Sequence, residues 1–200
     1  MRNRRLWIGI GLVLAGLVPK PIQALDEAVI GLYARFVDRD AHFVLSIGAQ
    51  LGTTRDEEIG CALYLAHVSR RPVEEIIAMR RRGMAWFDIL VALRLPVDVV
   101  VVVVDRDYGP PYGKAWGYWA QRKKGQRVVL RLTDDELIRF VNVKIAAQVY
   151  GVPESTVVAE LARTPDFTVW VRAKEHGPGK GKGAGPPGKA KGKGRGKPHE

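Results

Sequence analysis

The chain has 200 residues, of which 46% are hydrophobic and 26% are charged, so it is long enough for one domain with a substantial core. Its net charge of +11 is unevenly spread: residues 1–24 contribute +4 and residues 176–200 contribute +6, which leaves +1 for residues 25–175. Because a nucleic-acid-binding domain usually carries its positive charge on the folded surface, this distribution argues against that class.

The first 24 residues have the three-part layout of a secretory signal peptide. Residues 1–5 are basic, residues 6–18 are apolar, and the segment ends at Ala24, after which cleavage is expected. The apolar run is shorter than the roughly 20 residues of a membrane-spanning helix, and Pro19 and Pro21 interrupt its continuation. The sequence therefore predicts a periplasmic or secreted protein, with an uncut N-terminal membrane anchor as the alternative.

Apolar spacing, caps and helix breakers predict a series of helices up to about residue 95. The expected helices cover residues 25–37, 42–51, 56–68, 72–82 and 85–93. Thr53, Thr54 and Asp56 are expected to cap the third helix, and Pro72 to open the fourth. Cys61 is the only cysteine and lies in the third helix, so we expect a buried thiol and no internal disulfide.

The same pattern recurs after residue 132. Thr133 and residues 134–136 are expected to cap a helix that runs to about Tyr150, and Pro153 opens the next one. Residues 167–171 form a last helix or an extended end. We interpret residues 54–95 and 133–172 as two related three-helix units, joined by a linker of residues 96–132.

The linker contains six consecutive valines at residues 99–104. Their propensity favours a buried strand, which residues 126–132 would pair with in a short β-ribbon. Because Pro96 resembles the helix-opening prolines at positions 72 and 153, a helix remains the alternative. The expected fold class is mainly α, with two related helical units joined by an aromatic linker rich in Gly and Pro.

The most distinctive part of the linker is residues 109–119, with four aromatic residues and three glycines. We expect a rigid aromatic loop whose rings pack it onto the two helical units, because large aromatic side chains in a loop are more often packed than displayed. The alternative is that Trp and Tyr faces stack on the sugar rings, prolines or cations of a ligand. The candidate ligand-binding residues are Tyr112, Trp116, Tyr118 and Trp119.

Each unit also contains a corner with the spacing of a helix-turn-helix. In the second unit, Ala147, Gly151 and Val157 stand at the positions of the small residue, the turn glycine and the anchoring residue of that motif. Residues 154–161 contain no Lys or Arg, although a recognition helix needs cations for phosphates. A corner used for packing is the favoured interpretation, and a DNA-binding regulator using residues 147–161 is the alternative function.

No enzyme signature is present in the sequence. The four histidines lack metal-ligand spacing, and there is no phosphate-binding loop or nucleophile motif. We therefore expect no catalytic residue, no cofactor and no metal site. The acidic clusters at residues 56–58 and 134–136 are interpreted as helix caps.

Residues 176–200 contain nine glycines, four prolines and seven cations, without any large apolar residue. Such a segment cannot bury enough surface to offset the entropy of ordering, so we expect it to be disordered. Its charge should bind anionic envelope polymers, a membrane surface or, non-specifically, nucleic acid. The cations concerned are Lys180, Lys182, Lys189, Lys191, Lys193, Arg195 and Lys197.

Residues 54–172 resemble a group of uncharacterised exported bacterial proteins. The resemblance rests on residues 80–89, on the GPPYGKAWGYW segment at 109–119, and on residues 133–136 and 150–152. It implies export and a helical fold, and it assigns no site residue. Together these features predict an exported, non-enzymatic binding or structural protein of the cell envelope.

Overall fold

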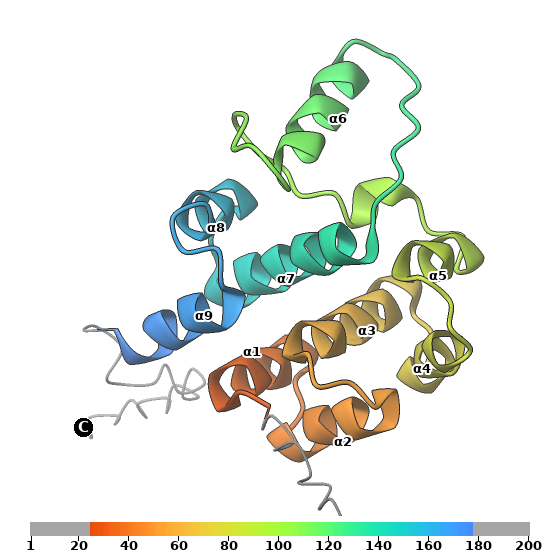
Figure 1. Cartoon of the computed structure of the whole chain (residues 1–200), viewed down its shortest axis with the longest axis vertical. Helices are drawn as coiled ribbons and strands as arrows, with labels where there is room; N and C mark the ends of the chain where they lie inside the picture. Colours follow the sequence, from red (N-terminus) through yellow and green to blue (C-terminus); the bar gives the residue numbers. More distant parts are fainter. Residues whose placement is uncertain (1–24, 178–200) are drawn as a thin grey trace, which may run out of the picture.

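The computed structural model describes residues 25–177, and this part of the chain is mainly α-helical (Figure 1). It contains no strand within the described residues. The elements are α1 (Glu27–Val37), α2 (Ala41–Leu51), α3 (Asp56–Ser69), α4 (Val73–Arg81), α5 (Trp86–Ala92), the 3-10 helix η1 (Val97–Val99), α6 (Gly113–Lys123), α7 (Asp134–Tyr150), α8 (Glu154–Leu161) and α9 (Phe167–His176).

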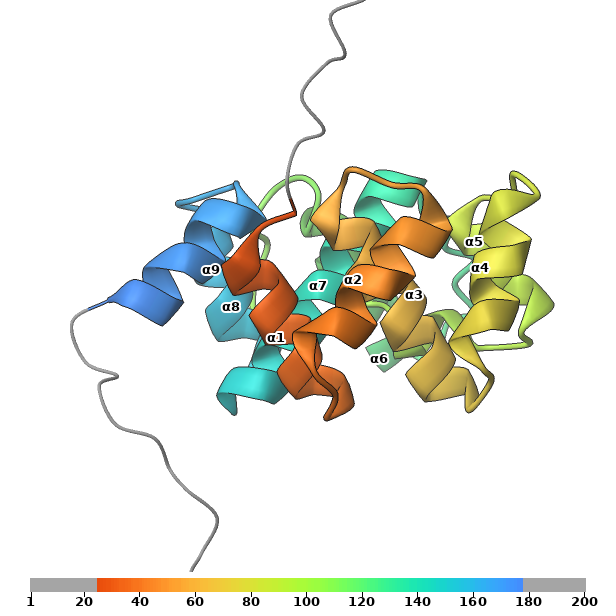
Figure 2. The same ribbon diagram turned by 90° about the horizontal axis from the view of Figure 1, so that it is seen from below.

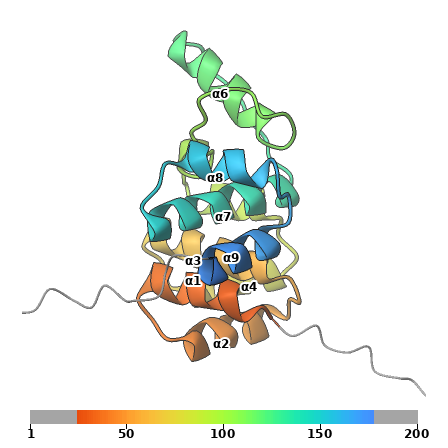
Figure 3. The same ribbon diagram turned by 90° about the vertical axis from the view of Figure 1, so that its left-hand side faces the viewer.

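Helices α3 and α7 lie side by side at the centre of the molecule (Figure 1). Helix α1 contacts both of them, and also packs against α2 and α9. Seen from below, α1, α2, α3 and α4 form the near face and α7 lies behind them (Figure 2). Helix α6 stands away from these layers, as Figures 1 and 3 both show.

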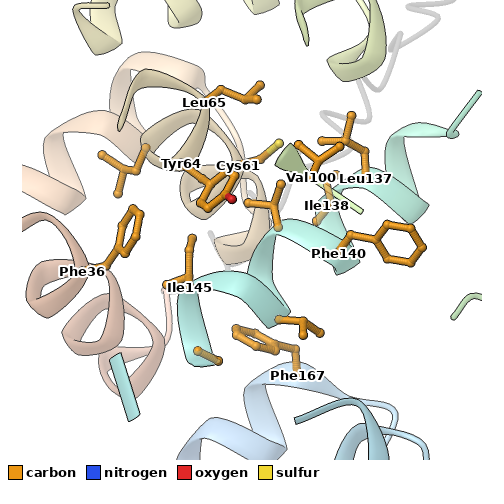
Figure 4. Packing of buried hydrophobic residues seen from close by; sticks show 14 of the residues in the cluster. Phe36, Cys61, Tyr64, Leu65, Val100, Leu137, Ile138, Phe140, Ile145 and Phe167 are labelled. Carbon is orange, nitrogen blue, oxygen red and sulfur yellow. The ribbon is translucent and has the colours of Figure 1, made fainter. Parts of the chain in front are cut away.

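One hydrophobic cluster runs through the helices of both predicted units (Figure 4). Phe36 of α1, Tyr64 of α3, Ile145 of α7 and Phe167 of α9 all belong to it. The residues of 54–95 and of 133–172 therefore share a core with each other and with α1, rather than forming two separate bodies.

Most helix ends follow the expected chemistry. Thr133 and Glu136 form a reciprocal capping box at the start of α7, and Gly52 and Gly151 end α2 and α7 in the left-handed conformation, with φ of 67° and 65°. The last predicted element is a helix, since Asp166 accepts a hydrogen bond from Val169 N at the start of α9. This helix extends to His176, one residue into the segment that the sequence assigned to the tail.

The cap predicted for α3 is wrong. Its N-cap residue is Arg55, without any side-chain hydrogen bond to the helix. Asp56 is buried, and its Oδ2 accepts a hydrogen bond from the backbone N of Asp26 at 2.8 Å, just before α1. The acidic side chain therefore joins two helices instead of capping its own.

The β-ribbon predicted from the valine run is also wrong, and so is a full helix there. Pro96 opens only the single turn η1, and residues 126–132 are irregular. Side chains bind the backbone of the run in place of a strand partner: Tyr64 Oη donates to Val99 O, and Trp119 Nε1 donates to Val102 O. Because Val100, Val101 and Val102 are fully buried in the helical core, the run gains its burial without a sheet.

The expected aromatic loop is irregular only up to Tyr112, because residues 113–123 form helix α6. The glycines at positions 113 and 117 lie inside this helix rather than in a turn. Cations in its last turn, Arg122 and Lys123, suit a helix C-terminus.

The two predicted units have similar corners. Arg70 ends α3 and Gly151 ends α7, both in the left-handed region, and Pro72 and Pro153 precede α4 and α8. The last helices of the two units have different neighbours: α5 packs against α7, whereas α9 packs against α1. A relation between the units by duplication stays a prediction.

Candidate functional site

Two of the four candidate aromatic residues are packed inside the molecule. Tyr112 is 5% exposed and stacks on Phe140 of α7, with ring centroids 6.1 Å apart. Tyr118 is 4% exposed and its hydroxyl donates to Asp98. Burial raises the pKa of each hydroxyl to about 12, and for Tyr118 the hydrogen bond to Asp98 acts in the same direction.

The two tryptophans, Trp116 and Trp119, are half-buried. Trp119 meets the ring of Tyr118 edge-on, with centroids 5.1 Å apart, and its indole N–H is bonded to Val102 O at 2.9 Å. The aromatic residues therefore hold α6 to the valine run and to α7, which corresponds to the favoured packing interpretation of this segment. Their remaining exposed surface lies on Trp116 and Trp119.

Tyr112 also lines a cavity of about 190 Å³ beside α7. Its polar walls include Arg55, Glu57, Arg139 and Asn142. Asn142 is already satisfied, because its Nδ2 donates to Glu57 O and Ile138 O and its Oδ1 accepts from Tyr33. Ligand pockets usually span about 300–1,000 Å³, so this cavity is small for a cofactor or drug-sized ligand.

The helix-turn-helix-like corner exists as a structural feature. Val152 N donates to Ala147 O across the turn, and Val157 is fully buried. The first residue of α8, Glu154, accepts a hydrogen bond from Val103 N at 2.6 Å and pairs with Lys144 at 2.9 Å. The end of α8 that would read DNA thus contacts the valine run and carries an acid.

An open groove of about 700 Å³ runs beside this corner. Tyr64, Val103, Lys144 and Gln148 contribute to its walls. Lys144 and Glu154 pair with each other in the groove wall, and Tyr64 donates its hydroxyl to Val99 O, so these groups are occupied within the protein.

The second acidic cluster combines a cap with a tertiary contact. Asp134 Oδ1 accepts from Trp86 N at 2.8 Å, and its Oδ2 accepts from Arg80 at 2.7 Å. Arg80 also pairs with Glu58 at 2.8 Å and lies over the ring of Trp86 at 4.8 Å. These carboxylates are therefore occupied in joining α3, α4, α5 and α7.

No three His, Cys, Asp or Glu side chains of residues 25–177 are grouped so that they could hold a metal ion. Cys61 is fully buried, and its burial raises the pKa of the thiol well above its ordinary value. Within the same residues, no helix is both long and apolar enough to cross a membrane.

The seven predicted polyanion-binding cations, from Lys180 to Lys197, lie outside the described residues, and so does the predicted signal peptide. Comparisons with protein-family models, with curated proteins and with solved structures find no match for this chain. The resemblance to exported bacterial proteins thus stays a prediction.

Sequence reasoning missed a basic surface at the end of α6. Lys123, Lys124 and Arg127 are exposed there, and Val129 nearby is 98% exposed. The near-neutral charge of residues 25–175 as a whole concealed this cluster. Net charge counted in short windows along the sequence reveals this cluster.

Proposed function

We propose that this chain is an exported, non-enzymatic binding protein of the cell envelope, held to anionic polymers by the cations of residues 176–200. One observation carries the proposal: these residues contribute +6, whereas residues 25–175 contribute +1. Inside the helical domain, many charges already have partners, such as Lys144 with Glu154 and Lys174 with Glu160. The C-terminal cations have a single acid, Glu200, in their own segment.

Binding of this kind is electrostatic and strongly salt-dependent. If all seven cations contact duplex DNA, the logarithm of the binding constant falls with the logarithm of salt concentration with a slope of about −6. Heparin serves as the test polymer, because it presents dense sulfate charge without sequence information. Duplex DNA serves as the second polymer.

The test compares the whole chain with a chain ended after Gly177, which keeps α9 intact. A third form replaces the seven cations by Gln and so keeps the segment's length. Both altered forms should lose heparin and DNA binding at low salt, because they have lost the charge. If either altered form still binds heparin or DNA at low salt, the proposal is contradicted.

Export is tested separately by cell fractionation and intact mass of the untagged protein. A periplasmic or secreted product that begins near Leu25 supports the proposed location. A full-length product in the cytoplasm contradicts it.

The second candidate is a DNA-binding regulator that uses the corner at residues 147–161. The geometry of the turn at Gly151 and the buried Val157 favour it, whereas the contacts of Glu154 and the absence of cations in α8 count against it. Selection from a random duplex pool with the chain ended after Gly177 tests this candidate. Enrichment of a sequence that the variant Thr156→Asp no longer binds would favour the regulator.

A further inference from the structure

The folded domain separates its charges more sharply than its net value suggests. Residues 113–132, which comprise α6 and the segment that follows it, contain six cations and no acid, so the rest of residues 25–175 carries −5. The six cations are Lys114, Arg122, Lys123, Lys124, Arg127 and Arg131. Helix α6 stands away from the other helices (Figures 1 and 3), so this charge lies on a projection of the molecule.

Half of these cations are occupied by acids from the rest of the domain. Lys114 pairs with Glu136 at 2.7 Å, Arg122 with Asp98 at 3.2 Å, and Arg131 with Asp88 at 3.7 Å. Among the described residues, no ion pair or hydrogen bond is found for the side chains of Lys123, Lys124 and Arg127. These three exposed cations define a basic tip at the end of α6.

Apolar surface lies directly beside the basic tip. Val129 is 98% exposed, and its neighbours Val128 and Leu130 are only half-buried. The half-buried Trp116 and Trp119 lie on α6, the helix that ends at the basic tip. Cations combined with an exposed aliphatic side chain are typical of elements that lie in the interface of an anionic membrane.

We propose that the basic tip docks on a bilayer surface that contains anionic phospholipid. Lys123, Lys124 and Arg127 contact the lipid phosphates, and Val129 enters between the headgroups. Nucleic acid or a sulfated polymer would satisfy the cations but would leave Val129 in water. This site is distinct from the polyanion binding proposed for residues 176–200, in both its residues and its ligand.

The first experiment places a fluorescent reporter at the proposed point of insertion. The whole chain carries Val129→Cys, labelled with an environment-sensitive nitrobenzoxadiazole group; the native Cys61 is fully buried and should remain unlabelled. The control carries Gln50→Cys, an exposed position in α2, at the opposite end of the molecule from α6 (Figure 1). The vesicles contain phosphatidylcholine alone or in equal parts with phosphatidylglycerol.

The label at position 129 should shift to shorter wavelength and brighten with the anionic vesicles, and much less with pure phosphatidylcholine. The label at position 50 should not change. If the protein sediments with anionic vesicles while the label at position 129 stays unchanged, another segment binds them and the proposal is wrong. An equal response to heparin or duplex DNA without vesicles would also refute it, because the ligand would then be a polyanion.

The second experiment removes charge from the basic tip in the labelled chain. Lys123→Gln/Lys124→Gln changes the last residue and the C-cap of α6, and Arg81→Gln/Arg82→Gln changes the same two positions of α4. Each membrane-adjacent cation strengthens binding by about fivefold, so the α6 pair should weaken the vesicle titration by about 25-fold. The α4 pair should change it by less than about twofold.

Both double variants remove two units of charge at a helix C-terminus, which matches their effect on helix stability. Far-ultraviolet circular dichroism checks that each has kept its helices. Equal weakening by the two pairs would mean that net charge alone governs binding, and this outcome would refute a site at α6. The chain ended after Gly177 should lose heparin binding but keep the vesicle response of the label at position 129. This result would show that the α6 site and the C-terminal site are separate.

Discussion

Gly60 lies in α3 at a point where α1 and α7 approach the helix closely. An added Cβ there would stand 2.6 Å from Asn142 Oδ1 and 2.7 Å from the ring of Tyr33. Tyr33 and Asn142 are buried and hydrogen-bonded to each other. Gly60→Ala should therefore force this pair apart, although alanine favours a helix over glycine.

The size of the effect follows from three contributions. Replacing glycine by alanine inside a helix stabilises it by about 1 kcal/mol. Overpacking a core costs about 1–3 kcal/mol, and leaving a buried polar atom without its partner costs about 1–3 kcal/mol. The expected net loss in the free energy of unfolding is therefore about 1–5 kcal/mol.

The matched control is Gly31→Ala in α1, where nothing lies within 4 Å of the added Cβ. This variant should gain up to about 1 kcal/mol from helix propensity alone. Urea unfolding, followed by circular dichroism at 222 nm, gives both values from the shift in midpoint at constant slope. If Gly60→Ala proves as stable as Gly31→Ala, the close approach at Gly60 and the reasoning built on it are refuted.

Three further variants or measurements test the contacts described above. Arg80→Met should lower the free energy of unfolding by about 1–3 kcal/mol, because Glu58 and Asp134 lose a shared, partly buried partner. The control Arg81→Met should change this free energy by less than about 0.5 kcal/mol. Similar losses in the two variants would contradict the role of Arg80. Burial opposes ionisation of Glu136, but hydrogen bonds from Lys114 and Thr133 outweigh burial and lower the pKa of this carboxyl below 4.5. Because the unfolded chain therefore takes up the proton first, the stability of the folded state should fall as the pH drops below 4.5. Glu136→Gln should make this fall shallower in acid unfolding curves, and an unchanged slope would show that the carboxylate is not held in the folded state. Cys61 should resist a thiol reagent such as dithiobisnitrobenzoate in the native protein and react fully in guanidinium chloride; rapid native labelling would show that the core opens around α3.

Helix positions could be predicted from the sequence where local chemistry sets the ends. Thr133 and Glu136 bond to each other's backbone within one turn, and Gly52 and Gly151 adopt the positive φ that ends their helices. These contacts involve residues a few positions apart, so their pattern is visible in the chain itself. The mainly helical fold class followed from such signals.

Other features depend on partners that are distant in sequence. Asp56 looks like a cap, yet it binds the backbone of Asp26, 30 residues away. The valine run looks like a strand, yet Tyr64 and Trp119 bind its backbone instead. No local pattern indicates these contacts.

The candidate site was predictable in part for the same reason. The aromatic segment was recognisable by composition, but the burial of Tyr112 and Tyr118 depends on Phe140 and Asp98 in other elements. The glycines at positions 113 and 117 suggested a loop and hid helix α6. The basic tip was present in the sequence and was missed because charge was summed over the whole domain.

The packing of α9 against α1 has a consequence for how the chain folds during synthesis. Arg172 of α9 bonds to Asp26, 146 residues earlier, and Arg35 of α1 bonds to Glu175. The first helix therefore acquires its last neighbour only after nearly all of the domain has left the ribosome. Such long-range closure slows folding, because the ordering entropy is lost before the contacts form. Until α9 has been synthesised, the face of α1 that it covers remains open to solvent and to chaperones.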